Sequence, residues 1–63
     1  MKNKQMSLDD QIAKEYSIRS AGKVISMLDI PKLFADVRAN ISPDRSNIGE
    51  LVDSSIVKYC IAA

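Results

Sequence analysis

Hydrophobic residues recur at helical spacing in the first third of the chain. Leu8, Ile12 and Tyr16 lie four residues apart, which predicts a short helix with a narrow apolar stripe extending to about residue 20. Ser7 precedes it, with an acidic residue three positions further on, a pattern similar to a capping box. A helix of this length is marginal alone, so we expect it either to dock on another surface or to fray.

A short strand is predicted after the breaker at Ser20–Gly22. The run Lys23–Ile30 (KVISMLDI) has two adjacent β-branched residues and an approximate alternation, which favours a strand. The positions expected to face away from the core are Lys23, Ile25, Met27 and Asp29. A register shifted by one residue would expose Val24 and Ser26 instead. A buried helical turn is the alternative for so short an apolar run.

Two amphipathic helices are predicted in the second half. Pro31 suits the first turn of a helix. The stretch Pro31–Ile41 then gathers its apolar residues on one face: Leu33, Phe34, Val37 and Ile41. Pro43 disfavours helix at the residue before it and so ends this segment. Ser46 or Asn47 suits the N-cap of the last helix, whose apolar stripe continues as far as Ile61.

The single predicted strand carries an implication for assembly. A lone strand leaves its backbone N–H and C=O groups unpaired, which folded proteins avoid. Because no second strand is predicted, we expect its partner to come from another copy of the chain, paired about a two-fold axis. The small size agrees, since a 63-residue domain buries only about 60% of its unfolded surface. The sequence therefore predicts a homodimer.

The amino-acid composition restricts the kinds of functional site that the chain can form. The chain has no histidine and one cysteine, Cys60, which excludes an internal disulfide and the usual Cys/His zinc sites. There is no glycine-rich phosphate loop and no nucleophile with a plausible base, so we expect neither catalytic residues nor a cofactor nor a metal, and no enzyme. No apolar run is long enough for a membrane helix. The start does not resemble a signal peptide and the cysteine is unpaired, so we expect a cytoplasmic protein.

The charges are nearly balanced, at +1 overall, but they are unevenly distributed. Residues 1–28 carry five basic and three acidic side chains, whereas residues 29–63 carry four and five. A polyanion would therefore meet the first half of the chain.

The order strand, helix, turn and helix resembles the ribbon-helix-helix (Arc-type) family of DNA-binding transcriptional regulators. Ser46–Cys60 is similar to the second helix of that family, with a serine at its start, Gly49 and Glu50, two aliphatic residues, and then Ile56 and Tyr59. The step at Ile30-Pro31 is similar to the junction between strand and first helix. The resemblance covers Lys23–Ile61. It implies a mostly α-helical dimerisation and DNA-binding domain over residues 23–63, preceded by an arm with a short helix over residues 1–22.

The resemblance also implies a function. Two copies would intertwine through an intersubunit two-stranded antiparallel ribbon that enters the major groove of double-stranded DNA. The implied base contacts are Lys23, Ile25 and Met27, of which the last two suit thymine methyl groups. The implied phosphate contacts at the start of the last helix are Arg45, Ser46 and Asn47. Arm contacts would come from Lys2, Lys4 and Arg19. The expected role is a repressor in promoter control or in plasmid or phage maintenance.

A second hypothesis belongs to another class. The chain would be an antitoxin-like or adaptor dimer whose N-terminal helix inserts Leu8, Ile12 and Tyr16 into the groove of a partner protein. DNA-binding antitoxins combine both properties, so the two hypotheses are compatible.

Overall fold

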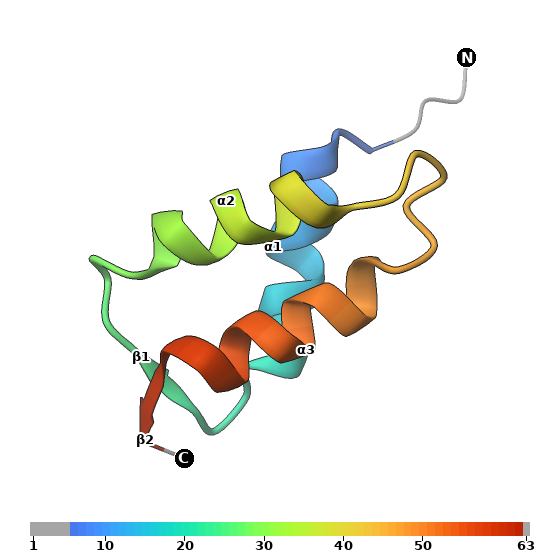
Figure 1. Cartoon of the computed structure of the whole chain (residues 1–63). Coiled ribbons are helices and arrows are strands. Elements are labelled where there is room, and N and C mark those ends of the chain that lie inside the picture. The colour runs from blue at the N-terminus through green and yellow to red at the C-terminus, as the bar shows by residue number, and fades with distance from the viewer. Residues whose placement is uncertain (1–5, 63) are drawn as a thin grey trace.

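The computed structural model describes residues 6–62 and contains three helices with a small two-stranded antiparallel sheet. The elements are α1 (Leu8–Arg19), β1 (Val24–Ile25), α2 (Ile30–Asn40), α3 (Ile48–Tyr59) and β2 (Cys60–Ala62). Helices α2 and α3 lie beside each other, α1 crosses behind them, and the sheet closes one end of the molecule (Figure 1). The predicted mostly helical fold is confirmed at this level, and the two-stranded antiparallel sheet lies within one chain.

The core draws on all three helices and on β1. Its six buried apolar side chains are Ile12, Ile25, Leu33, Val37, Val52 and Ile56. The partly buried rings of Tyr16 and Phe34 pack against this cluster, with their centroids 6.3 Å apart. The amphipathic stripes predicted for the three helices therefore converge, and α1 is docked rather than frayed.

Helix α1 has the predicted N-cap at Ser7 and is joined to α2 by an ion pair. The side chain of Ser7 accepts a hydrogen bond of 3.2 Å from the backbone N–H of Asp10, which confirms the predicted N-cap. Arg38 of α2 donates to the carboxylate of Asp9 at 2.8 Å and joins the first turn of α1 to α2. Ile12 is fully buried. The segment predicted as an arm thus supplies a core residue.

Strand β1 is much shorter than predicted. It stops after Ile25 because Ser26 forms a turn: its hydroxyl accepts from the N–H of Leu28, and its carbonyl accepts from the N–H groups of Asp29 and Ile30. Ile25 is 9% exposed and Val24 is 52% exposed. The prediction that Ile25 faces away from the core is therefore wrong, and within β1 the alternative register, which exposes Val24, is the one observed. Beyond β1 the alternation ends, because Ser26 lies in the turn and Met27 is exposed.

The second strand was not predicted. Helix α3 ends at Tyr59, and Cys60 takes an extended conformation with φ −67° and ψ 129°. β2 then pairs with β1 in antiparallel fashion, Val24 opposite Ala62 and Ile25 opposite Cys60, so that Ile61 is an extra residue without a partner. The expectation that the chain holds no second strand is wrong, and the sheet forms within one chain. An unpaired strand is therefore no longer a reason to predict a homodimer.

The boundaries of α2 and α3 lie close to the predicted ones. Pro31 sits in the first turn of α2, as expected. Asn47 occupies the N-cap position of α3, but its side chain spans the preceding turn, where its Oδ1 accepts from the N–H of Ser42 at 2.9 Å. No helix within residues 6–62 is long and apolar enough to cross a membrane.

Candidate functional site

Arg45 occupies the turn between α2 and α3, where a phosphate contact was predicted. Its Nη1 donates to the carbonyl oxygen of Met6 at 2.9 Å and to Oε1 of Gln11 at 2.6 Å. Its backbone has a φ of 60°, in the left-handed region that side-chain-bearing residues seldom adopt. The guanidinium is thus directed at the start of α1 and links that helix to the α2–α3 turn.

The start of α3 already holds an internal carboxylate. Oδ1 of Asp44 accepts from the backbone N–H of Ser46 at 3.1 Å and from the hydroxyl of Ser42 at 2.8 Å. These hydrogen bonds, that from the Ser46 backbone first, lower the pKa of Asp44, so that it is ionised at neutral pH. A phosphate approaching the N–H of Ser46 would meet a negative charge. Of the three predicted phosphate contacts, Ser46 is exposed, whereas Arg45 and Asn47 are committed to internal hydrogen bonds.

The three predicted base contacts do not share one surface. Lys23 is exposed just before β1, and Met27 is 83% exposed on the turn that follows it. Ile25 lies between them in sequence but belongs to the core. The structure therefore leaves two of the three side chains accessible and removes the third.

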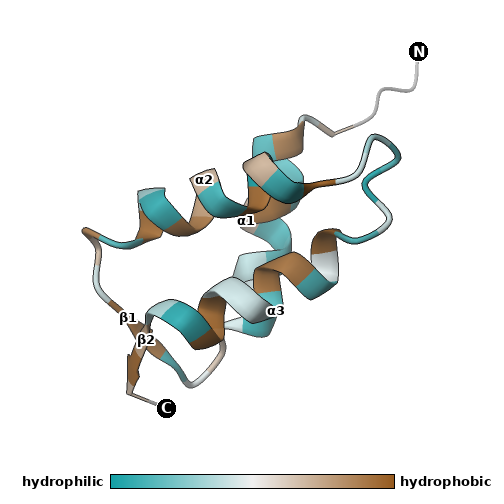
Figure 2. Ribbon diagram, viewed as in Figure 1, coloured by the Kyte–Doolittle hydropathy of each residue, from teal (hydrophilic) through white to brown (hydrophobic). Residues whose placement is uncertain are grey.

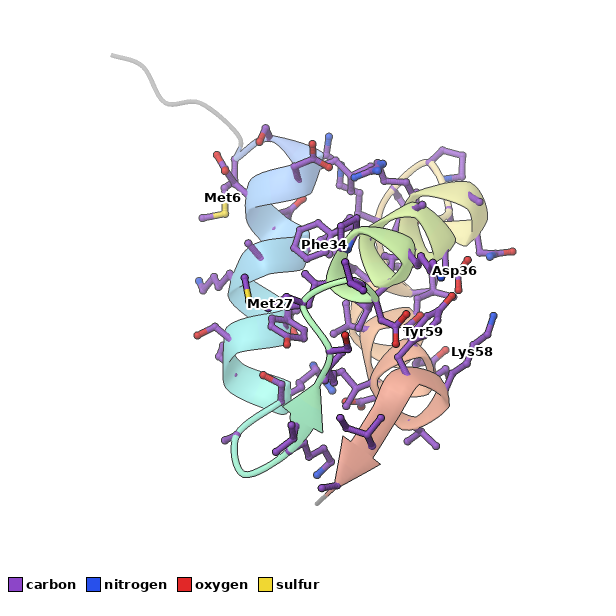
Figure 3. All side chains as sticks on the ribbon, turned by 90° about the vertical axis from the view of Figure 1, so that its left-hand side faces the viewer. Met6, Met27, Phe34, Asp36, Lys58 and Tyr59 are labelled. Carbon is purple, nitrogen blue, oxygen red and sulfur yellow. The ribbon has the colours of Figure 1, made fainter. Side chains whose placement is uncertain are left out.

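Met27 is one of several exposed apolar residues on β1, on β2 and on the turn into α2. We name this surface the apolar tip and define it as Val24, Met27, Leu28 and Ile61, which are between 52% and 83% exposed. Figure 2 shows the corresponding hydrophobic colour along β1 and β2 and on the turn into α2. Figure 3 looks onto this side of the molecule and labels Met27. The exposure of Leu28 and Ile61 was not predicted from the sequence. Leu28 was expected on the core-facing side of the predicted strand, and Ile61 on the apolar stripe of the last helix. Ser26, a turn-forming residue within the apolar run, was the available indication for Leu28.

The predicted arm contacts divide between described and undescribed residues. Lys2 and Lys4 lie outside the described residues 6–62. Arg19 forms ion pairs of 2.6 Å with Glu15 and with Asp53 of α3. Hydrogen bonding to Glu15, together with the charge of Asp53, raises the pKa of Arg19. A Cβ atom on Gly49 would lie 2.6 Å from Nη2 of Arg19, so this glycine leaves room for the guanidinium over α3.

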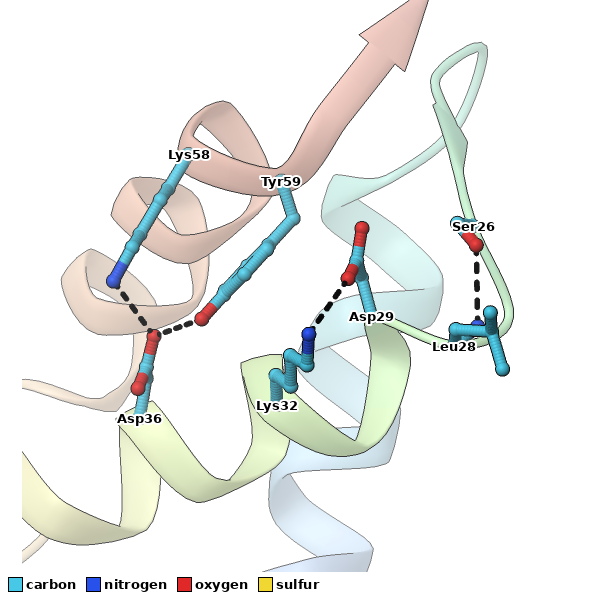
Figure 4. Close-up of polar contacts among 7 residues, drawn as sticks. All are labelled: Ser26, Leu28, Asp29, Lys32, Asp36, Lys58 and Tyr59. Carbon is cyan, nitrogen blue, oxygen red and sulfur yellow. Dashed lines mark hydrogen bonds and ion pairs between the residues drawn. The ribbon is translucent and has the colours of Figure 1, made fainter.

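A shallow groove lies between α2 and α3. It has a volume of about 210 Å³ and is lined by Asp36, Asn40, Leu51, Ser54, Ser55 and Lys58. Oδ2 of Asp36 accepts from the hydroxyl of Tyr59 at 2.6 Å and from Nζ of Lys58 at 3.1 Å (Figure 4). These contacts, the one with Tyr59 first, lower the pKa of Asp36, and Asp36 in turn raises the pKa values of Lys58 and Tyr59. The charges in the groove are thus neutralised internally.

Within residues 6–62 no three acidic or cysteine side chains are grouped so that they could hold a metal ion. No protein-family model matches the chain, and neither a curated protein nor a solved structure shows significant similarity to it. The likeness to ribbon-helix-helix regulators therefore rests on the residues quoted above, and the function must be argued from the surfaces of this molecule.

Proposed function

We propose that this chain is a non-enzymatic protein-interaction module and that the apolar tip is its binding face. The observation that carries the proposal is the exposure of Met27 and Leu28, adjacent large apolar side chains of which more than four fifths is open to solvent. Exposed apolar residues are common singly, but these two are adjacent, they directly follow β1, and Val24 and Ile61 lie on the paired strands β1 and β2. Groups of exposed apolar side chains mark interaction sites. Methionine also adapts its shape to a partner surface.

The face differs from the one expected for a partner protein. The stripe Leu8, Ile12 and Tyr16 of α1 packs into or against the core, so a partner cannot engage it while α1 is docked. The apolar tip is formed instead by β1, β2 and the turn into α2. The adaptor or antitoxin-like role is thus retained as a proposal, with its binding face moved from α1 to the tip.

Site-specific photo-cross-linking in the source cells tests this role. A benzophenone amino acid replaces Met27 in one variant and Ala39, an exposed residue of α2, in a matched control. We expect a discrete adduct from position 27 and none from position 39, because only the tip should touch a partner. The mass of the adduct shows whether the partner is a second copy or another protein. Equal or absent adducts at both positions would contradict the proposed binding face.

A DNA-binding transcriptional regulator, acting as a repressor, is the second candidate. Lys23 favours it, because this exposed cation directly precedes β1 and lies close in sequence to the exposed Met27. Both were expected among the base contacts. In a dimer the two Lys23 side chains would flank the paired tips and add positive charge there.

Fluorescence anisotropy tests the second candidate. The probes are a labelled duplex from upstream of the coding sequence and a scrambled duplex, each at two salt concentrations. A regulator should bind the first duplex more tightly, lose affinity as salt rises, and bind more weakly after Lys23→Ala. Equal weak binding to both duplexes, unchanged by Lys23→Ala, would exclude this role and leave the interaction module.

A further inference from the structure

Helix α1 contributes little to the core that it covers. Of the six buried apolar side chains within residues 6–62, Ile12 belongs to α1, and the other five lie on β1, α2 and α3. The other two residues of the α1 stripe, Leu8 and Tyr16, are only partly buried. Most of the core therefore belongs to the part of the molecule that excludes α1.

Helices α2 and α3 are joined to each other by contacts that do not involve α1. Asn47, just before α3, accepts from the N–H of Ser42 at 2.9 Å and donates to the carbonyl oxygen of Asn40 at 3.3 Å. Asp36 of α2 accepts from the hydroxyl of Tyr59 at the end of α3 (Figure 4). The β1–β2 pairing then links the end of α3 to the segment before α2. These contacts connect α2, α3 and the sheet independently of α1.

The ion pairs that join α1 to the other helices are exposed to solvent. Arg38 of α2 lies 2.8 Å from Asp9, and Arg19 lies 2.6 Å from Asp53 of α3. All four side chains are at least 36% exposed. Exposed ion pairs contribute little to stability, because water competes for both partners and salt screens them. These two pairs therefore hold α1 only weakly.

A further polar contact with α1 comes from a residue with a strained backbone. Nη1 of Arg45 donates to the carbonyl oxygen of Met6 and to Oε1 of Gln11, and the φ of Arg45 is 60°. This left-handed conformation is unfavourable for a residue that carries a side chain. Strained residues of this kind cluster at segments that switch between conformations. The junction between α1 and the α2–α3 turn is thus a place at which a conformational change is expected.

The turn between α1 and β1 provides a pivot. It runs from Ser20 to Lys23, and the N–H of Lys23 donates to the carbonyl oxygen of Ser20 at 2.9 Å. Gly22 has a φ of 79°, which glycine adopts without strain. Among the described residues, none beyond its chain neighbours has an atom within 4 Å of the Cβ position of Gly22. The turn is therefore free of packing at this point.

We propose that α1 detaches from α2 and α3 as a unit, with its pivot at Gly22, while α2, α3 and the β1–β2 sheet remain folded. This inference does not rest on the apolar tip, whose residues belong to the part that remains folded. The open form exposes Leu8, Ile12 and Tyr16, the stripe that a partner protein cannot reach while α1 is docked. A detached helix of 12 residues is marginal in water, so its amide hydrogens become exchangeable.

Hydrogen exchange of the full chain, followed residue by residue by NMR, tests the proposal. We expect the opening equilibrium constants of the central α1 amides, from Ile12 to Tyr16, to be at least about tenfold larger than those of the slowest α3 amides. These α1 amides lie away from the helix ends, so fraying does not account for the difference. Equal constants in the two helices would overturn the proposal, because α1 would then open only when the whole domain unfolds.

Two variants identify the open form. Asp9→Asn removes the ion pair with Arg38, which exists only while α1 is docked, so the opening constants of α1 and α3 should rise by the same factor, about two- to fivefold. Tyr59→Phe removes a contact between α2 and α3 that the open form keeps. It should therefore raise the constants of α3 by about threefold or more and leave those of α1 nearly unchanged.

The response of α1 to Tyr59→Phe decides between local and global opening. A rise in the α1 constants equal to that in α3 would overturn the proposal, because the open form would then have lost the α2–α3 contacts as well. Lys58→Ala removes the other α3 contact of Asp36 and repeats the test at a second position. It should likewise raise the constants of α3 and not those of α1.

Discussion

The hydroxyl of Tyr59 donates a 2.6 Å hydrogen bond to Oδ2 of Asp36, and so ties the last residue of α3 to the middle of α2 (Figure 4). Cys60 follows at once and begins β2. The contact therefore holds the point from which β2 leaves the helix and turns toward β1. Tyr59 also packs against the core cluster, so one side chain both contributes to the core and positions the strand beside the proposed binding face.

Tyr59→Phe should make the fold more sensitive to acid. The Tyr59 hydrogen bond lowers the pKa of Asp36 below its ordinary value of about 3.9, so its stabilisation is complete above that value and is lost as the pH falls through the lowered pKa. Without the hydroxyl the Asp36 pKa returns toward its ordinary value. The midpoint of acid unfolding, followed by circular dichroism, should then move to higher pH.

Tyr16→Phe is the matched control for this experiment. Tyr16 is a partly buried tyrosine that packs against Phe34, and removal of its hydroxyl leaves the Asp36 contacts intact. Identical acid midpoints for the two variants would show that the bond between Tyr59 and Asp36 does not contribute.

Ile12→Ala should destabilise the whole domain. Ile12 is fully buried against α2 and α3, and truncation of such a side chain in a core costs about 2–5 kcal/mol. Ile18→Ala, at an exposed position of the same helix, should cost less than about 0.5 kcal/mol. Urea unfolding measures both. If the two variants have equal free energies of unfolding, α1 is not part of the core.

Gly49→Ala should have an effect that depends on Arg19. Alanine favours a helix over glycine by up to about 1 kcal/mol, but the new Cβ would lie 2.6 Å from Nη2 of Arg19. The arginine must then swing away from Asp53 or Glu15. We therefore expect Gly49→Ala to increase the free energy of unfolding more in an Arg19→Ala background than in the parent chain. Additive effects in this double-mutant cycle would show that the two residues are not in contact.

The parts of this fold that the sequence predicts are those set by local periodicity. The stripe Leu33, Phe34 and Val37 faces the core because four-residue and three-residue spacing repeats on one side of a helix. Ser7 caps α1 because a serine hydroxyl can reach the free N–H groups of the first turn. Such features depend on neighbours within one turn, and they are the features that the structure confirms.

The sheet depends on distant residues and was predicted less well. β2 exists because Cys60–Ala62 meets β1, a segment more than thirty positions earlier, and nothing in the local pattern separates Ile61 from the helical stripe before it. The direction of the Arg45 side chain was not predicted, for a similar reason. Arg45 donates hydrogen bonds to Met6 and Gln11, which lie more than thirty positions earlier in the chain. Such long-range hydrogen bonds produce no repeating pattern in the sequence from which they could be predicted.

Two substitutions of Arg45 separate its backbone strain from its side-chain contacts. Both Arg45→Gly and Arg45→Ala remove the hydrogen bonds to Met6 and Gln11, but only glycine accepts a φ of 60° without a steric penalty. Arg45→Gly should therefore be more stable than Arg45→Ala by about 1 kcal/mol in urea unfolding. Both variants lack the guanidinium, so they should have equal affinity for duplex DNA. If the guanidinium only holds α1 through Met6 and Gln11, this affinity should also equal that of the parent chain. Loss of DNA affinity in both variants, with their stability difference retained, would instead assign Arg45 to a phosphate.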